Sequence, residues 1–297
     1  MGDIVTMDDL TNQEIVAVLD DAERLVPVAR GDVYLPLLKG KVLANMFFEN
    51  STRTRMSFET AMKRLGGSVL NFSSIGTSVA KGETLYDTMQ MIDGYADVAA
   101  IRHPRQGAAQ YSADAVEIPI LNAGDGAGNH PTQTMLDLFT IRQAHGTLEG
   151  LNVVLVGDLR YGRTVHSLSH ALVRFGAKLT LVSPSTLKMP VEIVSDLREH
   201  GSEIMETDSL EDQIAGADVI YVTRIQKERF PDEDEYAKVA GIYKIGASDL
   251  SGAMKGMIIM HPLPRVDEID PGVDSTEFAR YFEQAFNGVP TRMALLC

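Results

Sequence analysis

Five hydrogen-bonding side chains stand in a row near the start of the chain: Ser51, Thr52, Arg53, Thr54 and Arg55. Hydroxyl and guanidinium groups are donors that proteins use to bind phosphate and similar anions. If a helix begins here, its unpaired N–H groups add further donors and a partial positive charge. A plain helix cap needs only one hydroxyl. The row therefore predicts an anion site, with a helix cap as the alternative.

The residues around this row indicate a strand that leads into a helix. Residues 42–48 form an apolar run typical of a buried strand. After the row, apolar residues recur at helical spacing, and a Gly-Gly pair at 66–67 ends the pattern. The apolar face of this predicted helix consists of Phe58, Ala61, Met62 and Leu65.

Two more predicted strands lead into cationic or imidazole side chains. Arg102 follows an apolar run at 98–101, and His130 ends a Gly-rich loop that follows a run at 118–121. Open α/β sheets bind ligands at the carboxyl ends of their strands, where such loops lie. The same pattern of strand, polar loop and helix indicates a doubly wound α/β fold with parallel sheets flanked by helices.

The second half of the chain begins this pattern again at the apolar run 151–156. The segment after it, 157–164, nearly matches the nucleotide-binding motif G-x-x-x-x-G-K-[ST], but Arg163 replaces the lysine. A planar guanidinium does not substitute for that compact ammonium, so we do not expect an NTPase. Arg163 at a helix start suits a carboxylate instead.

Further candidate side chains follow the last two predicted strands. Arg224 and Gln226 come after the run 217–223, and alternation places them on one side of the chain. The segment from His261 to Arg265 follows a run at 257–260. Its two prolines, Pro262 and Pro264, predict a rigid loop that could contain a cis bond.

Metal binding is not expected. His166 and His170 are four residues apart on a predicted helix, but they lack the intervening Glu of H-E-x-x-H, so packing roles are favoured. The only cysteine, Cys297, excludes an internal disulfide. Lys81, at the tip of a loop over 73–82, is most simply a surface lysine when the residues are considered alone.

The composition limits the class of protein. A chain of 297 residues suggests two domains, and a formal charge of −14 argues against nucleic acid or an anionic membrane as a partner. We found neither a long apolar run nor a signal pattern, so the expected location is cytoplasmic.

These motifs together carry a resemblance that covers nearly the whole chain. The row 51–55 resembles the carbamoyl phosphate signature of the aspartate and ornithine carbamoyltransferases, and the His-Pro-Thr-Gln segment at 130–133 is also found across that family. Arginines suit the second carboxylate of aspartate, whereas ornithine needs an acidic partner. Arg224-x-Gln226 and the loop 261–265 resemble the aspartate branch.

The resemblance implies transfer of a carbamoyl group from carbamoyl phosphate to the α-amino group of L-aspartate, without a metal or organic cofactor. It implies a carbamoyl phosphate domain (1–130 plus 281–297), a linking helix (131–145) and an aspartate domain (146–280), with the active site in the cleft between them. The alternatives are transfer to ornithine or another amino acid, and an anion-binding homologue without activity.

Each matching position has an implied role. The phosphate would contact Ser51, Thr52, Arg53, Thr54 and Arg102, and the carbonyl oxygen would contact Thr54, Arg102 and His130, with His130 neutral. The carbamoyl amide would be held by Gln133 and by the backbone of Leu263 and Pro264. The carboxylates of aspartate would be held by Arg163, Arg224 and Gln226.

The resemblance also implies contributions from other subunits and from domain closure. An adjacent subunit of a homotrimer would supply Ser78 and Lys81, with Lys81 reaching both substrates; this replaces the surface reading of Lys81. Glu49 would pair with Arg163 and Arg229 when the domains close. A regulatory chain in a larger assembly is a further option that the residues leave open.

Overall fold

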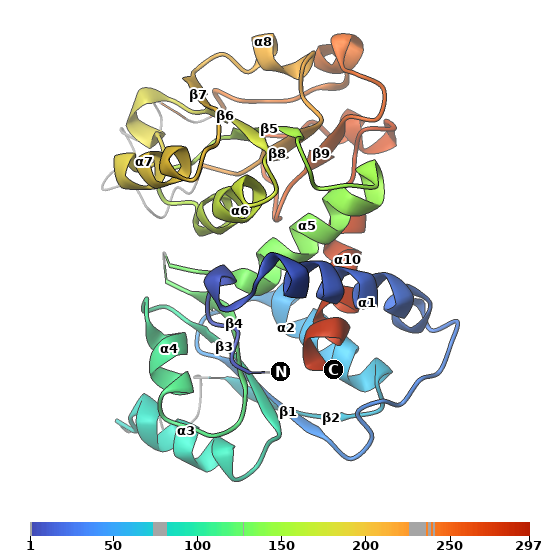
Figure 1. Cartoon of the computed structure of the whole chain (residues 1–297), viewed down its shortest axis with the longest axis vertical. Helices are drawn as coiled ribbons and strands as arrows, with labels where there is room; N and C mark the ends of the chain where they lie inside the picture. Colours follow the sequence, from blue (N-terminus) through green and yellow to red (C-terminus); the bar gives the residue numbers. More distant parts are fainter. Residues whose placement is uncertain (1, 74–81, 127, 226–235, 237–238, 240) are drawn as a thin grey trace. The chain divides into compact units, whose positions relative to one another are not determined.

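The computed structural model describes residues 2–73, 82–126, 128–225, 236, 239 and 241–297 (Figure 1). Within it the chain forms two compact units. The first unit contains Met1–Phe139 and Phe286–Cys297, and the second contains Thr140–Ala285. The chain passes from one unit to the other twice, once within helix α5 (Pro131–His145) and once within helix α10 (Tyr281–Leu296).

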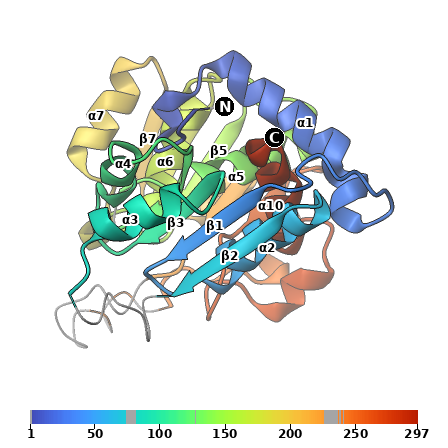
Figure 2. The ribbon, with the colours of Figure 1, turned by 90° about the horizontal axis from the view of Figure 1, so that it is seen from below.

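The first unit is built on a sheet of four parallel strands in the order β2-β1-β3-β4. The strands are β1 (Val42–Phe47), β2 (Ser68–Ser73), β3 (Val98–His103) and β4 (Ile120–Asp125). Figure 2 shows β1 and β2 side by side. Met46 lies opposite Phe72 on one side and Ile101 on the other, so the apolar run predicted at 42–48 occupies the middle of the sheet.

Helices cover both faces of this sheet. Ala44 and Met46 belong to an apolar cluster with Met89 and Ile92 of α3. On the opposite face, the Asn45 amide donates to the Arg55 carbonyl of α2, at 3.1 Å. The helices of this unit, besides the parts of α5 and α10 that it contains, are α1 (Asn12–Arg30), α2 (Thr52–Arg64), α3 (Leu85–Asp93) and α4 (Ala108–Ala113), with a 3-10 turn at Met7–Asp9.

The second unit contains five parallel strands in the order β7-β6-β5-β8-β9. They are β5 (Asn152–Val156), β6 (Lys178–Val182), β7 (Ile204–Thr207), β8 (Val219–Val222) and β9 (Ile258–Met260). Among the described residues, and besides its parts of α5 and α10, its helices with given bounds are α6 (Arg163–Val173), α7 (Val191–Glu199) and α8 (Glu211–Ile214), with 3-10 turns at Ser185–Leu187, Ala247–Gly252 and Pro271–Ser275. The central strands are buried on both faces, which explains their continuous apolar runs.

The predicted fold of two doubly wound α/β domains is confirmed. Several local expectations were wrong. Strand β4 continues through Asn122 to Asp125, which we expected to be loop, because their side chains are hydrogen bonded inside the unit. Helix α4 and edge strand β7 were not predicted.

The sequence predicts a terminal helix over 281–296, with Phe282, Ala285 and Phe286 at apolar spacing, but the buried face of α10 is a different one. Phe282 is 57% exposed and Ala285 is exposed, whereas Tyr281 and Gln284 are buried. Two buried polar residues of this helix, Gln284 and Arg292, make hydrogen bonds inside the protein, so the apolar spacing did not identify its packing face.

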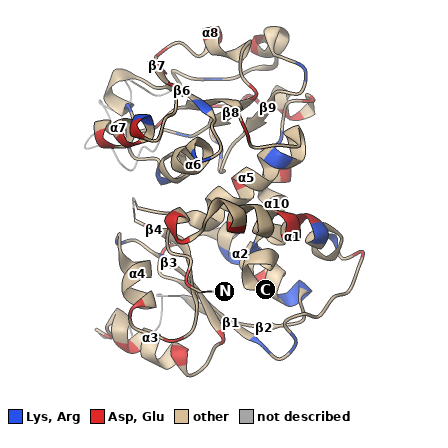
Figure 3. Cartoon of the chain, in the orientation of Figure 1, with Lys and Arg blue, Asp and Glu red and all other residues tan. Residues whose placement is uncertain are grey.

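Charged side chains occur on elements of both units, with acidic residues on α1, α3 and α7 (Figure 3). Within the described ranges, none of the helices has the length and hydropathy of a membrane span.

Candidate active site

Each sheet has one point where the order of its strands reverses. In the first unit the chain adds β2 on one side of β1 and then β3 and β4 on the other, so the reversal lies between β1 and β3. In the second unit it lies between β5 and β8. Ligands of open α/β sheets bind beyond the carboxyl ends of the strands at such points. The predicted anion-binding side chains follow these four strands.

Ser51 is the N-cap residue of α2, but its side chain makes no capping hydrogen bond to the helix. In the same unit, Thr11 and Thr84 do cap their helices, α1 and α3, through their side chains. The capping alternative is therefore wrong for the Ser51 hydroxyl. The first turn of α2 presents the row 51–54 at a helix N-terminus, where an anion is favoured.

Within this row the side chains differ in exposure. Arg53 is exposed, Thr54 is buried, and Arg55 is half-buried. Partial burial lowers the pKa of the Arg53 guanidinium. The positive charge of Arg55 is among the effects that lower the pKa of Glu59, after the hydrogen bond from Lys63. Arg53 is thus the arginine of the pair that faces outward beside the helix start.

Arg102 lies near the end of β3, directly beside the end of β1. Its backbone oxygen accepts a hydrogen bond from the Phe48 N–H at 2.8 Å. Its guanidinium donates to the Ala123 carbonyl at 3.3 Å and lies 3.1 Å from the Glu49 carboxylate. Arg102 therefore stands where the strand order of the first sheet reverses, next to the segment that leads into α2.

The loop before His130 is organised by the buried carboxylate of Asp125. One oxygen of this carboxylate accepts from the Asn129 N–H and the other from the Gly107 N–H, both at 2.8 Å. Asp125 thereby joins the loop after β3 to the loop after β4. His130 follows at the start of α5 and is buried.

Gln133 lies one turn further along α5. Its side-chain nitrogen donates to the Asp137 carboxylate at 2.9 Å. This contact orients the amide so that its oxygen, a hydrogen-bond acceptor, points away from Asp137. An acceptor in this place suits the N–H groups of a carbamoyl amide.

Arg292 of α10 is a buried cation that we did not single out from the sequence. It is 2% exposed, and its guanidinium donates to the Gly288 carbonyl at 3.1 Å and to the Thr132 hydroxyl at 3.5 Å. Burial lowers the pKa of this guanidinium, and the negative charge of Asp137 opposes the shift. An arginine inside a helix pattern gives no signal that could have revealed this contact with the 130–133 segment.

In the second unit, Gly157 and Thr223 bring the ends of β5 and β8 together. The Thr223 N–H and hydroxyl both contact the Val156 carbonyl, at 2.8 and 3.1 Å. Gly157 has φ +116°, and a Cβ there would lie 2.2 Å from the Thr223 carbonyl oxygen, so no other residue fits. Arg163 at the first position of α6 and Arg224 directly after Thr223 extend from these two strand ends.

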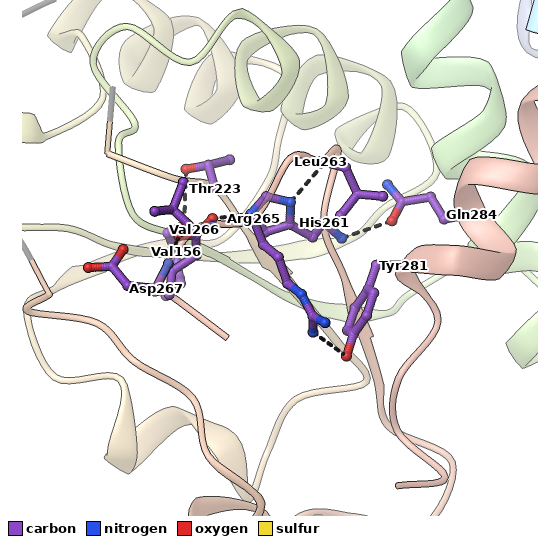
Figure 4. Close-up of polar contacts among 10 residues, drawn as sticks. Val156, Thr223, His261, Leu263, Arg265, Val266, Asp267, Tyr281 and Gln284 are labelled. Carbon is purple, nitrogen blue, oxygen red and sulfur yellow. Dashed lines mark hydrogen bonds and ion pairs between the residues drawn. The ribbon is translucent and has the colours of Figure 1, made fainter. Parts of the chain in front are cut away.

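The loop after β9 is closed by hydrogen bonds, which Figure 4 shows. The Leu263–Pro264 bond is cis, as the sequence suggested, and Leu263 has φ 57°. The His261 ring accepts from the Leu263 N–H at 2.8 Å and contacts the Glu268 carboxylate at 2.7 Å. The loop therefore presents the Leu263 and Pro264 backbone from a rigid frame.

Two family models account for nearly all of the chain. Residues 2–143 match "Aspartate/ornithine carbamoyltransferase, carbamoyl-P binding domain", and residues 149–297 match "Aspartate/ornithine carbamoyltransferase, Asp/Orn binding domain". The chain belongs to the aspartate/ornithine carbamoyltransferase family.

Similar proteins are named for the aspartate branch of this family. The aspartate carbamoyltransferase catalytic subunit of Archaeoglobus fulgidus is 54% identical over 297 residues, covering 100% of this chain and 98% of the relative. The catalytic subunit of M. jannaschii aspartate transcarbamoylase is 50% identical, with a TM-score of 0.93 and coverage of 100% and 97%. The Trypanosoma cruzi enzyme solved with carbamoyl phosphate and aspartate is 41% identical, with a TM-score of 0.95 and coverage of 99% and 95%.

Not every side chain that the family resemblance suggested can be placed. Ser78, Lys81, Gln226 and Arg229 lie outside the described residues. The first unit brings together Arg102, the row 51–54 and the segment 130–133 around its strand ends, and the second brings Arg163 and Arg224 to its own strand ends.

The two histidines of α6 have other contacts. His166 Nε2 lies 2.7 Å from the Leu159 carbonyl oxygen, and His170 Nδ1 lies 3.1 Å from the Asp196 carboxylate. Burial lowers the pKa of His166. In the part of the chain that is described, no three His, Cys, Asp or Glu residues are grouped as metal ligands would be.

Proposed function

We propose that this chain transfers the carbamoyl group of carbamoyl phosphate to the α-amino group of L-aspartate, giving N-carbamoyl-L-aspartate and phosphate. One observation carries the proposal. Residues 51–54 lie at the start of α2 with no capping hydrogen bond from the Ser51 side chain, beside Arg102, where the strand order of the first sheet reverses. Relatives that share half or more of its residues are named for this reaction.

The phosphate is bound by Ser51, Thr52, Arg53 and Thr54, with Arg102 beside them. Hydroxyls, guanidinium groups and helix N–H groups together supply charge-assisted hydrogen bonds to the phosphate oxygens. The net charge of −14 does not prevent this, because screening weakens distant charges beyond roughly 8–10 Å. The local cations therefore control the binding of the anion.

The carbamoyl group is bound next to the phosphate. Thr54, Arg102 and His130 donate to its carbonyl oxygen, and the Gln133 amide oxygen accepts from its NH₂ group. The backbone oxygens of Leu263 and Pro264 provide further acceptors. The hydrogen bond from Gln133 to Asp137 supports this assignment, since it leaves the Gln133 oxygen facing the other way.

Aspartate is held by cations of the second unit. Arg163 and Arg224 contact its carboxylates, and we assign Gln226 to the same role. Guanidinium groups bind carboxylates with two parallel hydrogen bonds, so two arginines distinguish a dicarboxylate from an amino acid with a distal ammonium. We propose accordingly that the first unit binds carbamoyl phosphate and the second binds aspartate.

The reaction is an addition followed by loss of phosphate. The α-amino nitrogen attacks the carbonyl carbon, negative charge develops on the carbonyl oxygen, and the bond to the phosphate oxygen then breaks. Each donor aimed at that oxygen contributes roughly 3–4 kcal/mol. Holding two small anions in line contributes up to about 7–11 kcal/mol. A phosphate oxygen is our candidate for the acceptor of the amino proton.

We also propose that the working enzyme is a homotrimer in which Ser78 and Lys81 complete the site of an adjacent subunit. Domain closure would bring Glu49 to Arg163 and Arg229. In the structure Glu49 is paired with Arg102, so closure exchanges one arginine partner for others. A regulatory chain in a larger assembly would be detected by sedimentation of the trimer with candidate chains.

The proposal is tested by following phosphate release from carbamoyl phosphate with aspartate or with ornithine. We expect turnover with aspartate and at least 100-fold lower kcat/KM with ornithine, roughly the cost of leaving a buried charge unpaired. Turnover with ornithine alone would identify the other branch of the family, and binding of phosphate without turnover would identify a homologue that is not an enzyme.

A further inference from the structure

The loop from His261 to Glu268 holds one backbone conformation through a chain of hydrogen bonds that ends on a buried histidine. We propose that His261 is a positioning residue: as the neutral Nε2–H tautomer it orients the Leu263 backbone, whose carbonyl holds the carbamoyl group. The inference rests on the proposed function, because the role of the Leu263 carbonyl belongs to it.

The contacts of the His261 ring determine which nitrogen carries the proton. The Leu263 N–H donates to His261 Nδ1 at 2.8 Å. A backbone N–H can only donate, so Nδ1 must present its lone pair and carry no proton. The remaining ring proton is then on Nε2, which lies 2.7 Å from a Glu268 carboxylate oxygen. The ring is 1% exposed, so water does not compete for these positions.

Glu268 is fixed as an ionised acceptor. Its second oxygen accepts from the Val266 N–H at 3.1 Å and from the Asp267 N–H at 3.0 Å. Both oxygens therefore face donors, and a proton on either would disrupt a hydrogen bond. Burial raises the pKa of Glu268, but the hydrogen bonds from His261 and the backbone outweigh burial and hold the pKa below its usual value. An ionised Glu268 requires a donor from His261, which favours the Nε2–H tautomer.

Helix α10 anchors the start of the same loop. Gln284 accepts a hydrogen bond from the His261 N–H at 2.8 Å (Figure 4). The loop is thus bound to α10 at its first residue, to the imidazole at its third and to Glu268 at its end. Its shape is specified at three places rather than by the two prolines alone.

These hydrogen bonds are most important for the backbone conformation of Leu263. Its φ of 57° lies in the left-handed region, which is uncommon for a non-glycine residue. Such a conformation costs of order 1 kcal/mol or more and persists where the surroundings hold it. The contact from the Leu263 N–H to His261 fixes the peptide before this residue. The Leu263 carbonyl belongs to the following peptide, and the narrow left-handed region limits how that peptide can turn relative to the fixed one.

Two substitutions separate the two contacts of the ring. In His261→Asn the side-chain oxygen takes about the place of Nδ1 and still accepts from the Leu263 N–H. In His261→Gln the longer amide reaches toward Glu268 as a donor but leaves no acceptor at the Nδ1 position. Both variants lose part of the ring packing, so each is the control of the other for stability.

We expect His261→Gln to lower kcat by about 10–100-fold, the usual cost of a reactant displaced by about 1 Å. His261→Asn should keep at least about fivefold more activity than His261→Gln at equal thermal stability. Equal kcat values in two folded variants, or higher activity of the Gln variant, would overturn the inference. Absence of turnover in the wild-type protein would instead overturn the proposed function, and this inference with it.

A spectroscopic measurement needs no substrate. In ¹⁵N-histidine-labelled protein, with the His261 signals assigned by their loss in His261→Asn, the ring should show a protonated Nε2 and an unprotonated Nδ1 at neutral pH. An Nδ1–H tautomer or an imidazolium at this position would overturn the inference even if the enzyme is active.

Discussion

The guanidinium of Arg292 lies over the ring of Phe58, with 5.0 Å between Cζ and the ring centroid. Phe58 is on α2, the helix that presents the row 51–54, and Arg292 also donates to Thr132, next to the buried His130. One buried cation on α10 therefore contacts the two helices that carry the anion-binding segments of the first unit.

Replacing Arg292 with Met should destabilise the protein by about 3–5 kcal/mol, because the buried carboxylate of Asp137 would lose its opposite charge. Chemical denaturation would measure the loss. The double variant with Asp137→Asn removes both charges and should regain part of it. A single Arg292→Met variant as stable as the wild type would show that this charge is not needed for folding.

The carboxylate of Glu268 should make stability depend on pH in acid. Its pKa is lowered from 4.5 to about 2, so its contribution is present above pH 4.5 and is lost as the pH falls through about 2. The unfolding free energy of Glu268→Gln should lie below that of the wild type near neutral pH, and the gap should close between about pH 4.5 and 2.

Glu283 offers a matched control for that experiment. Its side chain is 50% exposed, and its ion pair with Arg280 spans 3.4 Å at the surface. Glu283→Gln should change stability by less than about 1 kcal/mol across the same pH range. If the difference in unfolding free energy between Glu268→Gln and the wild type stays constant down to pH 2, the carboxylate of Glu268 is not ionised and hydrogen bonded as described.

The two arginines of the 51–55 row should differ in function. Arg53→Ala should weaken carbamoyl phosphate binding by about 10–100-fold, the value of one charge-assisted hydrogen bond. Arg55→Ala should change it by no more than about threefold, because Arg55 is half-buried and its charge acts on Glu59. Isothermal titration with carbamoyl phosphate would measure both affinities. An unchanged affinity in Arg53→Ala would rule out Arg53 as a phosphate ligand, and equal losses would contradict the proposed difference between the two arginines.

Glu49 should matter for aspartate and little for carbamoyl phosphate. Replacing Glu49 with Gln frees Arg102 from an ion pair of 3.1 Å, so the affinity for carbamoyl phosphate should stay equal or rise. The partner that we assign to Arg163 and Arg229 on closure would be lost, and kcat/KM for aspartate should fall by at least tenfold. Steady-state kinetics with each substrate varied would show whether the losses are equal, which would count against closure.

Sequence patterns identified those features of this protein that depend on residues close together in the chain. The apolar runs of β1 and β5 and the polar residues that follow them were readable, because strand, loop and helix adjoin in the chain. Contacts made across the fold were not readable. Arg292 reaches Thr132 over 160 residues, and Gln284 binds the His261 N–H from another element, and neither residue type predicts such a partner.

The same reasoning explains the errors in the loops. Asn122 and Asp125 have the composition of a turn, but their buried side chains accept and donate hydrogen bonds within the unit, so the strand continues through them. In α10, buried polar side chains replaced the apolar stripe on which the helix pattern depends.

The division of α10 between the units has a consequence for the order of events during synthesis. Residues 286–297 belong to the first unit, and they include Arg292 and the fully buried Met293. A ribosome completes Met1–Phe139 long before it reaches them, although domains near the N-terminus generally fold first. The second unit, continuous from Thr140 to Ala285, can leave the ribosome whole, whereas the first must wait for residues 286–297. In this protein the unit that is translated first is the one that is completed last.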